Sequence, residues 1–121
     1  MAWDVEFTDE FEAWWSTLDE GEQDAVARLV RLLEEYGPTL PFPYSSGVER
    51  SVYSHMRELR VQHGGRPYRV LYAFDPRSVA LLLIGGDKTG QDRWYEEYVP
   101  IADMIYNVHL DEFKKEQDGK D

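Results

Sequence analysis

Apolar and polar positions at the start of the chain predict a strand followed by a helix. Trp3, Val5 and Phe7 alternate with acidic residues, which is the period-two pattern of a half-buried strand. Thr8 then offers an N-cap for a short helix. The apolar residues of that helix are spaced so that they share one face, and they are Phe11, Trp14, Trp15 and Leu18.

A second helix is predicted from Asp19 to Tyr36. Asp19 and Glu22 have the spacing of a capping box, which satisfies free backbone donors at the start of a helix. Gly37 and Pro38 follow Tyr36, and this pair should end the helix. The apolar positions again fall on one face, at Val26, Leu29, Val30, Leu32 and Leu33.

The middle of the chain predicts a loop and then an antiparallel meander. Residues 37–47 carry three prolines and a serine pair, a composition typical of a loop. Strand-forming residues follow in three runs, at 56–63, 66–75 and 78–84. Gly64-Gly65 marks a tight turn between the first two runs, and Asp75-Pro76-Arg77 marks the next turn. The last run is apolar from 79 to 84, as expected of a central strand, and Gly85-Gly86 should end it.

The end of the chain predicts a third helix over residues 91–113, which Pro100 caps or kinks. Residues 114–121 are expected to form a polar, frayed tail. With 121 residues, 42% of them hydrophobic, the chain is long enough for one core, so residues 1–113 should form a single domain. The predicted class is α+β: an N-terminal strand and two helices packed on a small, mainly antiparallel sheet, with a C-terminal helix.

Charge is distributed unevenly along the chain. The net charge is −11, yet residues 50–93 hold eight basic and four acidic residues. A sequence pI near 4.6 disfavours general binding to nucleic acids or anionic membranes, so any such contact must be local. The chain has no cysteine, which excludes disulfides and thiolate chemistry, and its acidic first residues and lack of a long apolar run favour a cytoplasmic protein without membrane contact. The basic segment suggests an anion-binding site in an acidic scaffold.

The register of the predicted hairpin concentrates two of these cations. A two-residue turn at Gly64-Gly65 places two apolar pairs on one face, Leu59 with Val70 and Val61 with Tyr68. Arg60 then lies opposite Arg69 on the other face. Opposed like charges cost up to about 1 kcal/mol, so a counter-ion is expected. Either Glu58 supplies it in a solvated cluster, or a phosphate or a partner's carboxylate binds between the two guanidinium groups.

Three further features are ambiguous. Lys88 lies in a glycine-rich segment that lacks the spacing of a phosphate-binding P-loop. Arg93, Trp94 and Tyr95 begin the third helix, where the helix dipole and an aromatic ring suit an anion and a base. The same aromatic residues also fit an amphipathic core stripe. The three histidines lack the spacing of a metal-binding set, so no metal site is expected.

These segments resemble the RelE/ParE superfamily of bacterial toxins, and most closely its HigB-like, phage Gp49-related branch. The matching segments are residues 56–60, 68–75, 86–89, 93–95 and 101–103. The resemblance implies a RelE-like fold and a toxin of a type II toxin-antitoxin module. It also implies a ribosome-dependent endoribonuclease that cleaves translated mRNA without a metal or other cofactor. The implied partners are the ribosome, mRNA and a helix-turn-helix antitoxin that forms a hetero-oligomer with the toxin.

The resemblance also implies roles for particular residues. Arg69 and Lys88 would stabilise the phosphate, Arg60 would bind or orient it, and Tyr95 would transfer a proton. RNA-binding residues are expected to be Arg57, Arg66, Arg93 and Trp94.

Two departures leave the general base unassigned and two other functions open. Met56 and Glu58 stand where well-known ribosome-cleaving members carry lysines, and those members tend to be basic overall. One alternative is a ParE-like toxin that inhibits gyrase and cuts no RNA. The other is a catalytically inactive module whose arginine face binds an acidic antitoxin segment.

Overall fold

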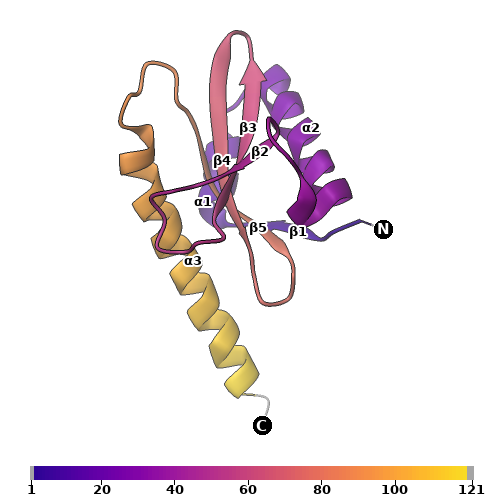
Figure 1. The fold of residues 1–121 in the computed structure, drawn as a ribbon, viewed down its shortest axis with the longest axis vertical. Helices are drawn as coiled ribbons and strands as arrows, with labels where there is room; N and C mark the ends of the chain where they lie inside the picture. The colour runs from indigo at the N-terminus through magenta and orange to yellow at the C-terminus, as the bar shows by residue number, and fades with distance from the viewer. Residues whose placement is uncertain (1, 120–121) are drawn as a thin grey trace.

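The computed structural model describes residues 2–119 and has an α+β fold, as expected (Figure 1). Its strands are β1 (Val5–Phe7), β2 (Ser45–Gly47), β3 (Arg57–His63), β4 (Arg66–Phe74) and β5 (Ala80–Asp87). Its helices are α1 (Asp9–Trp15), α2 (Glu20–Tyr36), the 3-10 turn η1 (Gly37–Thr39) and α3 (Trp94–Asp118). The strands form one sheet in the order β1-β5-β4-β3-β2, in which only the β1–β5 pair is parallel.

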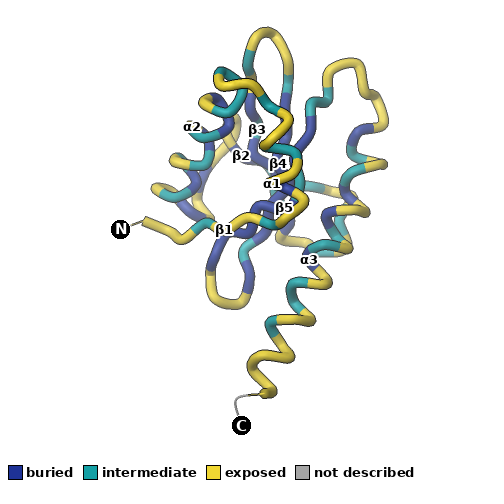
Figure 2. The backbone as a smooth tube through the Cα atoms, turned by 180° about the vertical axis from the view of Figure 1, so that it is seen from behind, coloured by how far each residue is buried: buried dark blue, intermediate teal, exposed yellow. Residues whose placement is uncertain are grey.

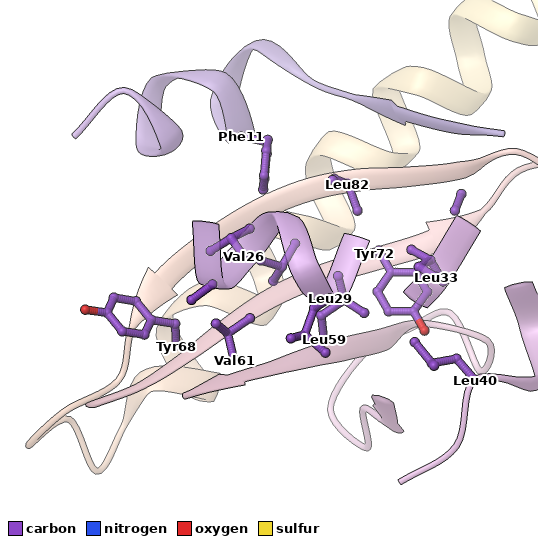
Figure 3. Close-up of a cluster of buried hydrophobic side chains, with 13 residues drawn as sticks. Phe11, Val26, Leu29, Leu33, Leu40, Leu59, Val61, Tyr68, Tyr72 and Leu82 are labelled. Carbon is purple, nitrogen blue, oxygen red and sulfur yellow. The ribbon is translucent and has the colours of Figure 1, made fainter. Parts of the chain in front are cut away.

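Helices cover both faces of the sheet and create two cores. α1 and α2 pack on one face, where α2 meets β3 and β4 in a cluster that includes Val26, Leu29, Leu59 and Val61 (Figure 3). α3 packs on the other face and buries Trp94, Val99, Ala102 and Tyr106 against the sheet. Alternate residues of β3 and β4 therefore face different helices, and this alternation decides which charged side chains can meet.

The predicted helix starts are confirmed by their caps. The Thr8 Oγ1 accepts a hydrogen bond from the Phe11 N–H at 3.0 Å. Asp19 and Glu22 form the reciprocal capping box, with distances of 2.8 and 2.9 Å. α2 ends at Tyr36, and the Gly37 that follows has a φ of 55°, a conformation that glycine adopts at little cost.

The predicted hairpin is also confirmed. β3 pairs with β4 so that Arg60 lies opposite Arg69, and Gly64 and Gly65 both have positive φ in the turn between the strands. The predicted loop over residues 37–47 is wrong at its end, because residues 45–47 form the edge strand β2 against β3. Three residues with a serine pair carry too little periodicity to reveal a strand, and pairing with β3 supplies the missing backbone hydrogen bonds.

The prediction that Gly85-Gly86 ends the third strand of the meander is wrong, since β5 runs on to Asp87. The two glycines are needed within the strand because large rings lie directly over them. A Cβ atom on Gly85 would clash with the Trp14 indole, and one on Gly86 would lie 2.7 Å from the Trp94 Nε1. The sheet can therefore extend past the apolar run only where side chains are absent.

α3 begins and ends later than the sequence pattern predicts. It starts at Trp94 and continues to Asp118, with Pro100 inside it. Residues 114–118, predicted to belong to a frayed tail, are exposed helix, because they are good helix formers and no glycine follows until Gly119. Residues 120 and 121 of that predicted tail lie outside the described residues.

Candidate functional site

A cluster of charged and polar side chains lies on the α3 face of the sheet, with Glu58 at its centre. Glu58 Oε1 accepts a hydrogen bond from the Tyr95 hydroxyl at 2.6 Å, and Arg69 Nε lies 3.4 Å from the same oxygen. Glu58 Oε2 accepts from the Ser46 hydroxyl at 2.6 Å and lies 3.5 Å from Arg60 Nη1. The acid that compensates the opposed arginines is therefore part of the chain itself.

Strand alternation and the start of α3 assemble this cluster. Glu58 and Arg60 occupy the positions of β3 that alternate with the buried Leu59 and Val61, so they face α3. Tyr95 reaches them from the first turn of α3. Strand alternation thus determines that Glu58 and Arg60 lie on the α3 face of the sheet. The connection from β5 to α3 then brings the Tyr95 phenol onto the same face.

The centre of the cluster is buried. Glu58 is 4% exposed and Arg69 is 5% exposed, so water scarcely screens their attraction. The Arg69 guanidinium is also held by the Tyr68 carbonyl at 3.0 Å and by the Tyr95 hydroxyl at 3.3 Å. Burial, together with the hydrogen bond to Glu58, raises the pKa of Tyr95, so the phenol stays protonated at neutral pH.

Arg60 and Lys88 lie at the edge of the cluster and keep access to solvent. The Arg60 side chain is 30% exposed, and its guanidinium carbon lies 5.1 Å from the centre of the Phe42 ring. Lys88 follows β5, its backbone N–H donates to the Pro67 carbonyl, and its Nζ lies 5.4 Å from the centre of the Tyr95 ring. The four residues predicted to be catalytic therefore lie in one cluster, although their roles stay predictions.

A pocket of about 230 Å³ opens beside this cluster. Its lining combines the start of the β2–β3 connection with two cluster residues, and consists of Gly47, Val48, Glu49, Arg50, Glu58 and Tyr95. Glu58 and Tyr95 are thus the two cluster residues that line this pocket. A small polar group in this pocket could exchange a proton with either side chain.

The residues predicted to bind RNA do not converge on this pocket. Arg57 faces the α2 side of the sheet, where its Nε donates to the Ser45 hydroxyl at 2.9 Å. Arg66 is on the surface beside the hairpin turn, 3.5 Å from Asp87. Arg93 is exposed and paired with Glu96 at 2.8 Å. These arginines are accessible to different degrees, but they lie on separate parts of the surface.

Trp94 does not fit the prediction of an RNA-stacking residue. Its side chain is 1% exposed, and its indole stacks on Tyr98 with a distance of 4.6 Å between ring centres. Gly86 leaves the space that this ring fills. The amphipathic core stripe that the sequence also allowed is the arrangement observed for Trp94.

Sequence reasoning missed two residues of the site, Ser46 and Arg50. Ser46 donates to Glu58 because β2 pairs with β3 in the register that places these two residues opposite each other. Arg50 lines the pocket and lies 3.6 Å from Glu96. Ser46 could have been found by recognising the serine pair as a strand beside an acidic residue of β3. No local signal in the sequence marks Arg50.

Residues 2–119 contain neither a cluster of metal ligands nor a helix that could span a membrane. No group of three or more histidine, aspartate or glutamate side chains in this range is arranged to hold a metal ion. None of the helices described is long and apolar enough to cross a membrane.

Solved structures with similar backbones define the class of the fold. A mutant of E. coli toxin RelE in the free state matches with a TM-score of 0.55 and 13% identity, over 79% of this chain and 94% of RelE. The RelBE2 toxin-antitoxin complex of Mycobacterium tuberculosis matches with a TM-score of 0.54 and 18% identity, over 72% of this chain and 99% of the other. A RelE-RelB complex of Pyrococcus horikoshii OT3 matches equally well, at 0.54 and 17% identity, over 73% and 97%. The fold is therefore RelE-like.

Sequence comparisons then show the family. Residues 13–107 match the family described as phage derived protein Gp49-like. Two relatives come from Mycobacterium tuberculosis (strain ATCC 25618 / H37Rv). "Putative toxin HigB3" is 43% identical over 77% of this chain and 81% of its own length, and "Putative toxin HigB2" is 38% identical over 84% of this chain and 52% of its own length. The chain belongs to the Gp49-like family and is a HigB-like toxin of the RelE/ParE superfamily, which confirms the resemblance found in the sequence.

Proposed function

We propose that this toxin is a metal-independent endoribonuclease that cleaves translated mRNA on the ribosome and is held inactive by an antitoxin. The observation that carries the proposal is the position of Glu58. Glu58 lines a pocket, and its carboxylate is surrounded by Arg69, Arg60 and the Tyr95 phenol. A proton acceptor beside cations and a protonated phenol is the set of groups that RNA cleavage by the 2′-hydroxyl requires.

Each step of that reaction can be assigned to a side chain. Glu58 would take the proton from the 2′-hydroxyl, whose oxygen attacks the adjacent phosphorus. Arg60, Arg69 and Lys88 would stabilise the negative charge of the pentavalent phosphate. Tyr95, kept protonated by its raised pKa, would give its proton to the departing 5′-oxygen and recover one from Glu58. The products would be a 2′,3′-cyclic phosphate and a free 5′-hydroxyl.

The partners follow from the relatives. Two of the structural relatives are toxin-antitoxin complexes, and the curated relatives are toxins. By analogy this chain would form a hetero-oligomer with an antitoxin of the helix-turn-helix type and would act in the cytoplasm, where ribosomes and mRNA are found. The net charge of −11 disfavours long-range attraction to any RNA, so contact with the message would depend on the local cations of the cluster.

The test is to induce the toxin in cells and map new RNA 5′ ends on translated and untranslated messages. We expect cuts in translated RNA only, at least 100-fold fewer with Glu58→Gln and with Tyr95→Phe, and unchanged with Arg28→Gln, which changes an exposed arginine on α2. Tyr95→Phe removes one hydroxyl and should fold normally, so it keeps the test informative if Glu58→Gln is unstable. Full cleavage by both site variants would overturn the mechanism.

The burial of Arg69 favours one other candidate, an inactive binding module. Its guanidinium is already shared among Glu58, Tyr95 and the Tyr68 carbonyl, which leaves little room for a phosphate. If induction of the wild type neither slows growth nor cuts RNA, this candidate replaces the nuclease. Intact RNA with DNA double-strand breaks would instead indicate inhibition of gyrase.

A further inference from the structure

A second surface, distinct from the Glu58 cluster, carries exposed apolar side chains. On α3 these are Ile101 at 39%, Met104 at 69% and Val108 at 52% exposed, and beside them on β1 lies Phe7 at 57%. The three α3 residues are spaced three and four apart, so they form one stripe along the helix. Figures 1 and 2 show that α3 runs along one side of the sheet and that its C-terminal half extends past it.

Met104 and Val108 of this stripe, together with the half-buried Ile105, form one wall of a groove of about 450 Å³, and the end of β1 with the start of α1 forms the other. Leu81 of β5, which is 3% exposed, contributes to the lining. Most polar residues of the lining are acidic. The acidic ones are Glu6, Asp9, Glu10 and Glu112, and the other two are Thr8 and His109. No lysine or arginine lines this groove in the described part of the chain. The neighbouring Arg77 is already paired with Glu6 and Asp75.

We propose that this groove binds a basic amphipathic helix of a protein partner. An apolar stripe with helical spacing accepts the apolar face of a second helix by ridge-into-groove packing. The acidic rim would attract lysine and arginine on the flanks of that helix and would repel an acidic segment. The groove therefore determines two properties of the helix that it binds. One face of that helix should be apolar, and the flanks of that face should be cationic.

A second copy of this chain fits the groove poorly. Each copy carries a net charge of −11, and a symmetric dimer would set the same acidic rim against itself. A partner with the opposite charge removes this repulsion. The proposed docking site does not depend on whether the chain cleaves RNA. Only the identification of the helix as part of the antitoxin rests on the proposed function.

A designed peptide can test the groove with the full chain. The probe is an 18-residue helix of leucine and lysine with all leucines on one face, and its controls are a scrambled peptide of the same composition and one with glutamate in place of lysine. Protein labelled at the methionine methyl groups gives the location, because Met104 lines the groove whereas Met56 is fully buried elsewhere. We expect the amphipathic lysine peptide alone to shift the Met104 methyl signal while the Met56 signal stays in place.

Matched variants separate docking from general attraction to an acidic protein. Met104→Ser with Val108→Ser should weaken the peptide at least 10-fold, and Glu10→Gln with Glu112→Gln should do so by a similar factor. Removing two charges on α2, with Glu20→Gln and Asp24→Asn, should change binding by less than 2-fold. Equal losses from the α2 pair and the groove pair, or unchanged binding by the serine variant, would overturn the proposal. Self-association of the wild type that the serine variant abolishes would overturn it in favour of a homodimer.

Discussion

The pairing of Glu58 with Arg69 should dominate the stability of the site. Each side chain is only 6% exposed, and Glu58 Oε1 is 3.4 Å from Arg69 Nε. Removing one partner of a buried ion pair usually costs about 3–5 kcal/mol, because the other charge is left without compensation. Glu58→Gln keeps the shape, but its single carbonyl oxygen can accept from only one of Tyr95 and Ser46, and its NH2 group would have to donate to the other hydroxyl. The cost should come mainly from the stranded Arg69 and be about 3 kcal/mol.

The reverse change should cost slightly less. In Arg69→Met the Glu58 carboxylate keeps the hydroxyl donors Tyr95 and Ser46 and has Arg60 nearby at 3.5 Å, so about 2 kcal/mol is expected. The double variant removes both charges together and should cost at most about 2 kcal/mol, because replacing a buried pair with neutral groups of similar volume is often nearly neutral. The coupling energy is then about 3 kcal/mol.

The wild type, the two single variants and the double variant form a double-mutant cycle. Urea denaturation of these four proteins, followed by tryptophan fluorescence and circular dichroism, gives the coupling energy if the m-value stays constant. Glu58→Gln combined with Arg66→Met is the matched control, since Arg66 is exposed and pairs with Asp87 away from the cluster. That control should be additive within about 0.5 kcal/mol. If the Glu58 and Arg69 changes are equally additive, the two charges do not depend on each other and the reasoning is refuted.

Two other predictions concern the sheet. Burial alone would raise the pKa of Asp75, but hydrogen bonds from Arg77, His109 and two backbone N–H groups lower it. This carboxylate therefore stabilises the fold fully above its ordinary pKa, and the stabilisation is lost as the pH falls through the lowered pKa of the folded state. Asp75→Asn should therefore cost about 3 kcal/mol at pH 7 and less towards pH 3, and a gap that does not shrink in acid would contradict this. Gly85→Ala should cost about 1–3 kcal/mol, because the added Cβ would clash with the Trp14 indole. Thermal melts should show that adding Trp14→Leu restores part of the lost stability. If Gly85→Ala causes no loss, the Trp14 ring can move away and the reasoning is wrong.

Local patterns predicted the fold well where a side chain interacts with its own neighbours along the chain. The Thr8 cap, the Asp19 capping box and the opposed arginines all follow from spacing within one helix or one hairpin. The misses depended on distant residues. β2 exists because β3 is there to pair with it, and β5 passes through Gly85-Gly86 because two tryptophans need the room.

The candidate site divides along the same line. The sequence placed Arg60 and Arg69 on one face because register is local, and it left the compensating charge open between Glu58 and an external phosphate or carboxylate. It did not predict that Glu58 would be buried and reach a pocket, because this requires the hydroxyls of Ser46 and Tyr95, which come from β2 and α3. Nor could it separate Tyr95, which meets the cluster, from Trp94, which lies in the core one residue earlier.

The basic segment of the sequence is largely neutralised once the chain is folded. Glu58 lies near Arg60 and Arg69, Asp87 near Arg66, and Glu96 near Arg50 and Arg93. Within residues 2–119, Lys88 and Arg57 have no such carboxylate partner: Arg57 donates to Ser45 on the α2 side of the sheet, whereas Lys88 lies near the Tyr95 ring. An incoming phosphate would therefore compete with carboxylates for most of these cations, and its most favourable first contact is Lys88. Lys88 lies beside Tyr95, so a phosphate bound to Lys88 would be next to the phenol that donates to Glu58. The negative charge of that phosphate would then compete with the Glu58 carboxylate for Arg60 and Arg69.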